Sequence, residues 1–119
     1  MKLPQLRGRS TEQQAKRLLE RHGLKTLERN YQCRLGEIDL IMRDGDSLVF
    51  VEVRYRGKSA RSGAKESVDA RKQSKLIATA LHYLQQHQAR QNWPMRFDVI
   101  AADEGADPPL EWIKDAFRP

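Results

Sequence analysis

The sequence predicts an α/β domain with the element order helix, three strands, helix, strand. Three observations support it. Residues 36–56 contain two alternating runs around an Asp44-Gly45 turn, which is typical of a β-hairpin. Apolar residues at helical spacing follow from residue 66, and another strand-like segment, Met95–Ala101, comes after them. A helix between two strands favours a crossover that pairs those strands in parallel, so we expect a mixed central sheet flanked by helices.

The first helix is predicted to begin at Ser10 and to end before Gly23. Ser10 and Gln13 have the spacing of a capping box, and glycine is the usual residue after a helix C-terminus. Glu12 lies one turn before Ala15, on the inward stripe of this helix. Taken alone, an acid in a first turn is most simply explained by the helix dipole.

An irregular strand is predicted from Leu24 to Arg34, and the central hairpin follows it. A loop at residues 44–47 gives three cross-strand pairs, namely Arg43–Leu48, Asp39–Glu52 and Glu37–Arg54. A loop with an odd number of residues would mix valines with acids, so the pattern selects this register. One face is then wholly apolar, and we expect the helices to cover it; it consists of Ile38, Leu40, Met42, Val49, Val51 and Val53.

The other face of the hairpin carries the candidate chemistry. Asp39 and Glu52 would face each other across the strands, where two carboxylates repel. Ile41 and Phe50 indicate partial cover, and Arg54 emerges about 7 Å along the strand from Glu52. A solvated hairpin face is the ordinary alternative. An Asp, a Glu and a base together also suit a divalent metal beside a cation, the combination that phosphodiester hydrolysis needs.

The second helix is predicted from Glu66 to about Gln91. Lys72 lies on the edge of its apolar stripe, where a solvated lysine and a phosphate contact are both consistent with the pattern. In the strand that follows, Asp98 points away from Phe97; we interpret it as a strand-edge carboxylate, with an acid behind the site as the alternative. The last apolar segment, LEWIKDAF, is compatible with an edge strand or a short helix.

Length and composition fit one domain spanning residues 1–119. The sequence has no apolar run long enough to cross a membrane, and MKLPQLRGRS lacks the apolar region of a signal peptide. The single cysteine, Cys33, cannot form an internal disulfide, and no Cys/His spacing indicates zinc. We therefore expect a cytoplasmic protein without a membrane partner. The sequence does not fix the oligomeric state, and a homodimer is one of the states that it allows.

The net charge of +6 and the pI of about 9.8 favour a polyanionic partner, most of all because of where the cations lie. Basic residues crowd the segment directly after the acidic face. We expect five of them to contact nucleic-acid phosphates: Arg56, Lys58, Arg61, Lys65 and Lys72. A membrane surface is a poorer fit, because no basic amphipathic helix with a bulky aromatic face accompanies them.

The blocks GEIDLI, VFVEVRYR and RFDVI, with a helix before the last, resemble the YraN family of small uncharacterised bacterial proteins. That family is similar to the PD-(D/E)XK nuclease superfamily, above all to archaeal Holliday-junction resolvases. The resemblance runs from about Gly8 to Ile100 and implies a restriction-endonuclease-like fold with an αβββαβ core. It matches Asp39 to the metal-binding aspartate and Glu52 to the second acid of the motif.

Three further positions follow from the same resemblance. Glu12 matches a glutamate that resolvase-like members add to the site, and Ile38 replaces the proline of the motif. Arg54 stands where the superfamily usually has lysine. Because a guanidinium group stays protonated, Arg54 can polarise or clamp a phosphate but cannot accept a proton.

The resemblance and the charge pattern together predict a Mg²⁺- or Mn²⁺-dependent endonuclease acting on DNA, with branched or otherwise structured DNA as one substrate class. Asp39 and Glu52 would ligate the metal, Glu12 would add a ligand directly or through water, and the Val53 carbonyl could supply another oxygen. Arg54 would steady the scissile phosphate. The alternatives are a catalytically inactive nuclease-fold protein that binds nucleic acid, and an adaptor whose basic loop docks on an acidic protein.

Overall fold

The computed structural model describes residues 4–55, 68–103 and 109–119. Two helices, one short 3₁₀ helix and five strands make up this part of the chain. In chain order they are α1 (Pro4–Arg21), β1 (Lys25–Cys33), β2 (Gly36–Asp44), β3 (Ser47–Tyr55), α2 (Ala70–Gln86), η2 (Gln88–Arg90), β4 (Met95–Ala102) and β5 (Leu110–Phe117). No helix in the described ranges is both long and apolar enough to cross a membrane.

The five strands form one mixed sheet in the order β1-β2-β3-β4-β5. Strands β1, β2 and β3 are antiparallel neighbours, β3 and β4 are parallel, and β5 is antiparallel to β4. The parallel pair is joined through α2, as the crossover rule predicts. The predicted order of helices and strands is therefore confirmed. The segment LEWIKDAF forms the edge strand β5, which was one of its two predicted conformations.

The helix α1 is longer than predicted and ends where predicted. It begins at Pro4, so Ser10 lies inside the helix and the predicted start at Ser10 is wrong. Proline is well tolerated in a first helical turn, because the N–H that it lacks would have no partner there. At the other end the Leu24 N–H donates to the Leu19 carbonyl at 3.1 Å, and Gly23 has a φ of +94°. This left-handed residue after the helix favours glycine.

The helix α2 is shorter than predicted. It begins at Ala70, because the Asp69 carboxylate caps it by accepting the Lys72 N–H at 2.9 Å. It ends at Gln86, because His87 has a non-helical backbone with φ −133° and ψ 67°. The predicted bounds at Glu66 and Gln91 are therefore wrong, and residues 88–90 form the separate helix η2.

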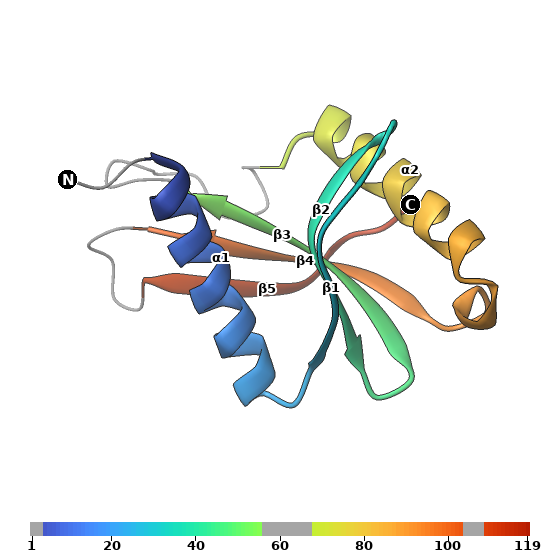
Figure 1. The fold of residues 1–119 in the computed structure, drawn as a ribbon, viewed down its shortest axis with the longest axis horizontal. Coiled ribbons are helices and arrows are strands. Elements are labelled where there is room, and N and C mark those ends of the chain that lie inside the picture. Colours follow the sequence, from blue (N-terminus) through green and yellow to red (C-terminus); the bar gives the residue numbers. More distant parts are fainter. Residues whose placement is uncertain (1–3, 56–67, 104–108) are drawn as a thin grey trace.

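The two helices cover opposite faces of the sheet. In Figure 1 the helices α1 and α2 lie on either side of the β1–β2 hairpin. The α1-side cluster buries Ala15, Leu19, Leu24, Leu40, Met42, Val49, Val51 and Ile100. The α2-side cluster buries Ile38, Ile41, Leu48, Phe50, Val68, Leu76, Ala80, Tyr83, Phe97, Val99 and Ala101. The expectation that both helices cover the valine face is therefore wrong. Phe50 and its neighbours on β4 form a second apolar face, which α2 removes from water.

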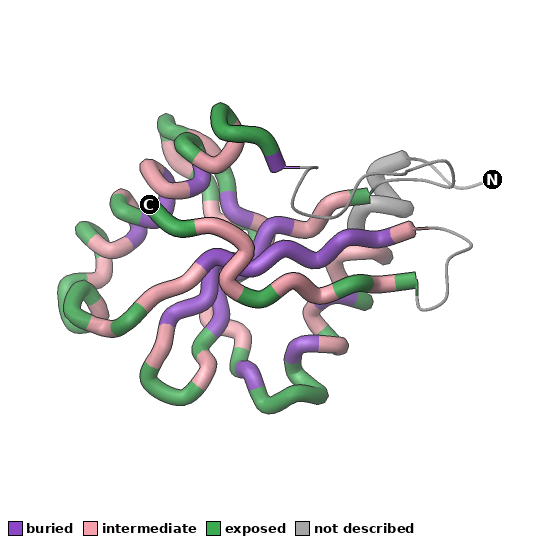
Figure 2. The backbone as a smooth tube through the Cα atoms, turned by 180° about the vertical axis from the view of Figure 1, so that it is seen from behind, coloured by how far each residue is buried: buried purple, intermediate pink, exposed green. Residues whose placement is uncertain are grey.

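Burial is deepest in the middle of the sheet. Figure 2 shows almost continuous burial along β4 and much of β3, whereas the edge strands β1 and β5 alternate between intermediate and exposed positions. Strands that are covered on both faces read as apolar runs rather than as alternating patterns. The two buried charged residues of these strands, Glu52 on β3 and Asp98 on β4, therefore need partners.

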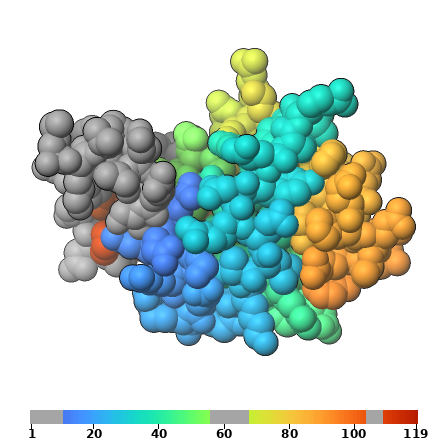
Figure 3. Space-filling model, viewed as in Figure 1, coloured from blue at the N-terminus to red at the C-terminus, as the bar shows by residue number. Residues whose placement is uncertain are grey.

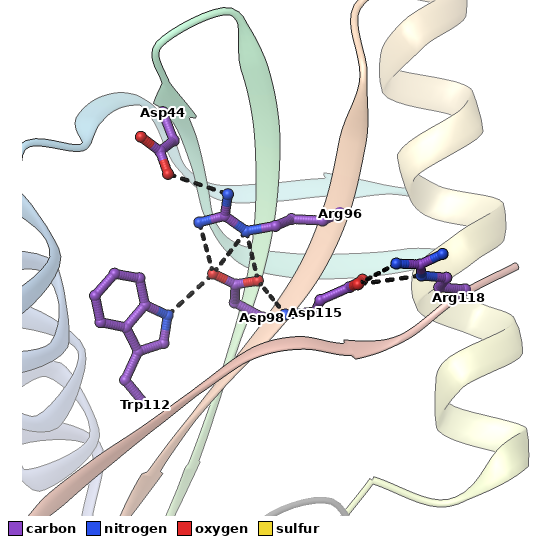
Figure 4. Close-up of polar contacts among 6 residues, drawn as sticks. All are labelled: Asp44, Arg96, Asp98, Trp112, Asp115 and Arg118. Atoms are coloured by element: carbon purple, nitrogen blue, oxygen red, sulfur yellow. Dashed lines mark hydrogen bonds and ion pairs between the residues drawn. The ribbon is translucent and has the colours of Figure 1, made fainter.

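Asp98 on β4 is such a group, with no exposed surface at all. Its carboxylate accepts hydrogen bonds from Arg96 Nε at 3.0 Å, from Trp112 Nε1 at 3.0 Å and from the Asp115 N–H at 2.9 Å (Figure 4). Arg96 also pairs with Asp44 through its Nη1 atom at 3.0 Å. The network thus ties β4 to β5 and to the end of β2.

The interpretation of Asp98 as a strand-edge carboxylate is wrong, because β5 pairs with β4 and covers it. Its neighbours Phe97 and Val99 belong to the α2-side cluster, so Asp98 points toward the face that α1 covers. A buried carboxylate with this many donors serves to hold the strands together.

Replacing Asp98 by alanine is expected to lower the free energy of unfolding by about 3–5 kcal/mol, the usual cost of leaving a buried charge without its partner. Arg96, the Trp112 indole N–H and the Asp115 N–H would all lose their acceptor. Urea denaturation followed by circular dichroism measures the change. The matched control is Asp115→Asn, which removes the ion pair with exposed Arg118 but keeps the backbone N–H. A control loss as large as that of Asp98→Ala would contradict a special role for the network.

Candidate functional site

The hairpin register is confirmed from Asp44–Ser47 back to Leu40–Val51, and then the backbone pairing stops. Beyond that point the Asp39 side chain replaces a backbone partner, since its Oδ2 accepts the Val53 N–H at 2.8 Å. The expected pairs Asp39–Glu52 and Glu37–Arg54 are therefore not among the β2–β3 backbone pairs of the described residues; Glu37 pairs with Gln32 of β1.

The same break changes the face on which Ile38 lies. Ile38 belongs to the α2-side cluster, whereas Leu40 belongs to the α1-side cluster, although strict alternation would place them together. The predicted membership of Ile38 in the valine face is therefore wrong. The change of face therefore coincides with the point at which the Asp39 side chain replaces the backbone partner of Val53.

Asp39 and Glu52 nonetheless lie close enough to perturb each other. Glu52 is 6% exposed, and burial, followed by the charge of Asp39, raises its pKa to about 7. Burial likewise raises the pKa of Asp39, and the hydrogen bond from the Val53 N–H partly offsets that rise. The predicted opposition of two carboxylates is thus present in the fold, and it is unfavourable when both are ionised.

Two cations lie beside Glu52, and they come from different elements. Lys72 Nζ of α2 is 3.6 Å from Glu52 Oε2, and Arg54 Nη1 of β3 is 3.7 Å from the same oxygen. Both lower the pKa of Glu52, but by less than burial and Asp39 raise it. The site therefore combines an acid pair with two positive groups beside Glu52.

Glu12 reaches this region from α1. It is half-buried, and its pKa is raised by burial first and by the charge of Asp39 second, while Arg29 of β1 lowers it. Within the described ranges, however, no three Asp, Glu, His or Cys side chains form a group that could hold a metal ion. The fold therefore brings Asp39 and Glu52 together and leaves Glu12 at the border of the pair.

The expected nucleic-acid contacts divide into two sets. Lys72 lies in the first turn of α2, directly beside Glu52. The other four, Arg56, Lys58, Arg61 and Lys65, lie outside the described residues. On the visible face in Figure 3 the surface of β1 and β2 lies between those of α1 and α2.

Two contacts were missed by reasoning from the sequence. The ion pair between Lys72 and Glu52 was not predicted, although recognising Asp69 as the helix cap would have placed Lys72 in the first turn beside the sheet. The influence of Arg29 on Glu12 was missed as well. Extending the register count to β1 would have found it, because Arg29 pairs with Leu40, the residue after Asp39.

The raised pKa of Glu52 makes stability depend on pH. The folded state holds the Glu52 proton more tightly than the unfolded state, in which the pKa is near 4.5. The free energy of unfolding should therefore fall as the pH rises from about 4.5 to about 7, by roughly 3 kcal/mol at about 1.4 kcal/mol per unit. Glu52→Gln cannot ionise and should flatten this slope. Denaturation in the presence of a chelator at pH 5 and pH 8 measures it.

The matched control is Asp46→Asn, which removes the same charge from a side chain that is 96% exposed. It should keep the slope of the unaltered protein. An equal slope in Glu52→Gln and in the unaltered protein would show that Glu52 does not titrate between pH 5 and pH 8.

Comparison with known proteins places these residues in a family. Residues 11–102 match the uncharacterised protein family UPF0102. The chain is 53% identical over 112 residues to a UPF0102 protein of Pseudomonas syringae pv. syringae, covering 92% of this chain and 91% of the relative. It is 52% identical over 114 residues to one of Nitrosococcus oceani, with coverages of 94% and 91%. The expected YraN resemblance is confirmed, and the chain belongs to the UPF0102 family.

Proposed function

We propose that this protein is a metal-dependent endonuclease that hydrolyses phosphodiester bonds in DNA, with branched or structured DNA among its substrates. The observation that carries the proposal is the buried Asp39–Glu52 pair, in which burial first and the charge of Asp39 second raise the pKa of Glu52 to about 7. Strongly perturbed acids with specific charged partners are typical of functional sites. A divalent cation between the two acids would relieve their repulsion.

The order of the elements supports a nuclease fold. A mixed sheet with an α-β-β-β-α-β core is the arrangement that the PD-(D/E)XK resemblance implies, and both acids lie on the hairpin that carries the motif in that superfamily. Fold analogy alone does not establish an activity. The proposal therefore depends on the acid pair and its cations.

The donor set fits Mg²⁺ or Mn²⁺, because both metals prefer carboxylate oxygens and retain several water ligands. Asp39 and Glu52 would hold the ion, and Glu12 is placed to contribute through water, since it borders the pair without completing a three-acid group. When bound, such a metal would lower the pKa of a water and stabilise negative charge on a phosphate.

The protein's own cations account for the rest of the site. Arg54 and Lys72 lie beside Glu52, where they could bind the scissile phosphate once it enters. The segment that carries Arg56, Lys58, Arg61 and Lys65 follows β3 directly in the sequence, so phosphates farther along a duplex are the proposed partners of those residues.

Metal binding is expected to depend on both acids. Asp39→Asn and Glu52→Gln each remove one anionic ligand while keeping nearly the same shape, and the amide oxygen that Asp39→Asn introduces could still accept the Val53 N–H. Losing an outer partner of a metal ligand already costs about 10- to 100-fold in affinity, so losing a ligand should cost at least as much. Mn²⁺ titration followed by calorimetry measures it, and Asp46→Asn is the control.

The same variants test the activity. Linear, flapped and four-way DNA incubated with Mg²⁺ or Mn²⁺ should be cut by the unaltered protein and by Asp46→Asn, and left intact by Asp39→Asn and Glu52→Gln. Unchanged Mn²⁺ affinity in both acid variants would refute the site, whatever the outcome of the cleavage assay.

A second candidate function is a catalytically inactive nuclease-fold protein that binds nucleic acid. Arg54 favours it, because this residue occupies the usual lysine position and is already engaged with Glu52 at 3.7 Å. The two functions make different predictions for a single substitution.

If Arg54 clamps a phosphate during cleavage, Arg54→Lys should keep or raise the rate, because an ammonium group supplies the same charge. Arg54→Ala should abolish cleavage while Mn²⁺ binding persists. Single-turnover cleavage of a labelled substrate measures both rates. An unaltered protein that is inert on every substrate, combined with activity in Arg54→Lys, would instead support the inactive binding protein.

A further inference from the structure

We propose that Lys72 is a counterion which Glu52 holds while no metal is bound, and which moves to a DNA phosphate when a divalent cation takes its place. Metal binding and DNA binding would then be coupled through one side chain. This inference rests on the proposed function, and it assigns to Lys72 a positioning role within the same site.

The first observation is that Lys72 and a metal would use the same group. Lys72 Nζ lies 3.6 Å from Glu52 Oε2, and Glu52 is 6% exposed. The carboxylate already has Arg54 at 3.7 Å on the same oxygen. A divalent cation that arrives at Glu52 would be repelled by both cations, so at least one of them should retreat.

The second observation identifies Lys72 as the cation that can leave. Arg54 is two residues from Glu52 on the same strand, so its side chain emerges on the same face of β3. Lys72 comes from a separate element. The two side chains are similarly exposed, 34% for Lys72 and 39% for Arg54, so the distinction lies in the element and in the chemistry of the side chain. A lysine has a flexible four-carbon stem that carries a point charge, which suits exchange between two anionic partners.

The third observation is that the backbone of Lys72 is anchored independently of the ion pair that its ammonium group makes with Glu52. The Lys72 N–H donates to the Asp69 carboxylate at 2.9 Å, which anchors the residue in the first turn of α2. A released ammonium group would therefore stay at the mouth of the acid pair and swing toward solvent. A phosphate approaching the pair would meet it there.

The test measures how much a metal strengthens DNA binding. Fluorescence anisotropy with a labelled DNA duplex is recorded with and without Ca²⁺, which occupies oxygen sites while limiting cleavage, at pH 8.5 so that Glu52 is ionised. Coupling between two ligands commonly amounts to about fivefold or more, and we expect at least that enhancement in the unaltered protein. Lys72→Gln should reduce it to less than about twofold, and Lys72→Arg should restore most of it.

The matched control is Lys75→Gln, which removes the same charge from an exposed residue one turn along the same helix. It should keep the full enhancement, so general effects of salt and net charge cancel between the two variants. A second readout is Mn²⁺ affinity without DNA at the same pH, which should be no weaker in Lys72→Gln, because a competing cation has been removed.

The outcomes are distinguishable. If the unaltered protein binds no Mn²⁺, or binds no DNA, both the proposed function and this inference fail. If it binds both and Ca²⁺ strengthens DNA binding equally in Lys72→Gln and Lys75→Gln, the proposed function stands and the role of Lys72 is overturned. Weaker Mn²⁺ binding in Lys72→Gln than in Lys75→Gln would also overturn it, because Lys72 would then support the metal instead of competing with it.

Discussion

The buried carboxylate of Glu52 is the constraint on which the candidate site depends. A carboxylate at 6% exposure is unfavourable unless nearby charges compensate it, and Asp39 adds to the cost. Lys72 and Arg54 stabilise the ionised form of Glu52 only in part, because its pKa remains raised to about 7. The acid pair thus combines repulsion between Asp39 and Glu52 with attraction to two cations that compensates it only in part.

Asp98 is a buried carboxylate whose hydrogen-bonding capacity is filled by its neighbours. It lies on the neighbouring strand and is fully buried, yet a guanidinium group, an indole N–H and a backbone N–H all donate to it at about 3 Å. Glu52, by comparison, has ion-pair partners at 3.6 and 3.7 Å. Dense hydrogen bonding is typical of an acid with a structural role, whereas an acid whose charge is poorly compensated is a better candidate for binding.

The covering of the sheet on both faces decides from which side each charged side chain reaches the acid pair. Because α1 and α2 pack on opposite faces, Glu12 and Lys72 approach the hairpin from different sides. At the break in backbone pairing the Asp39 carboxylate accepts the Val53 N–H, and its charge acts on both Glu12 and Glu52. In a regular hairpin, strict alternation would have placed Ile38 and Leu40 on the same face of the sheet.

The sequence by itself determined the order of elements, the hairpin register near the turn and the closeness of Asp39 to Glu52. Alternation with a period of two and a short turn leave few other registers, and a helix between two strands leaves few other topologies. The tertiary structure decided what depends on distant contacts. Where the Asp39 side chain takes the Val53 N–H, Ile38 lies on the other face of the sheet from Leu40, and the pairing of β5 with β4 made Asp98 a buried centre of hydrogen bonds. The docking of α2 brought Lys72 to Glu52, twenty residues away, because packing against Phe50 and its neighbours fixes where that helix lies on the sheet. Local patterns do not encode such contacts, since each depends on which surfaces the whole chain must remove from water.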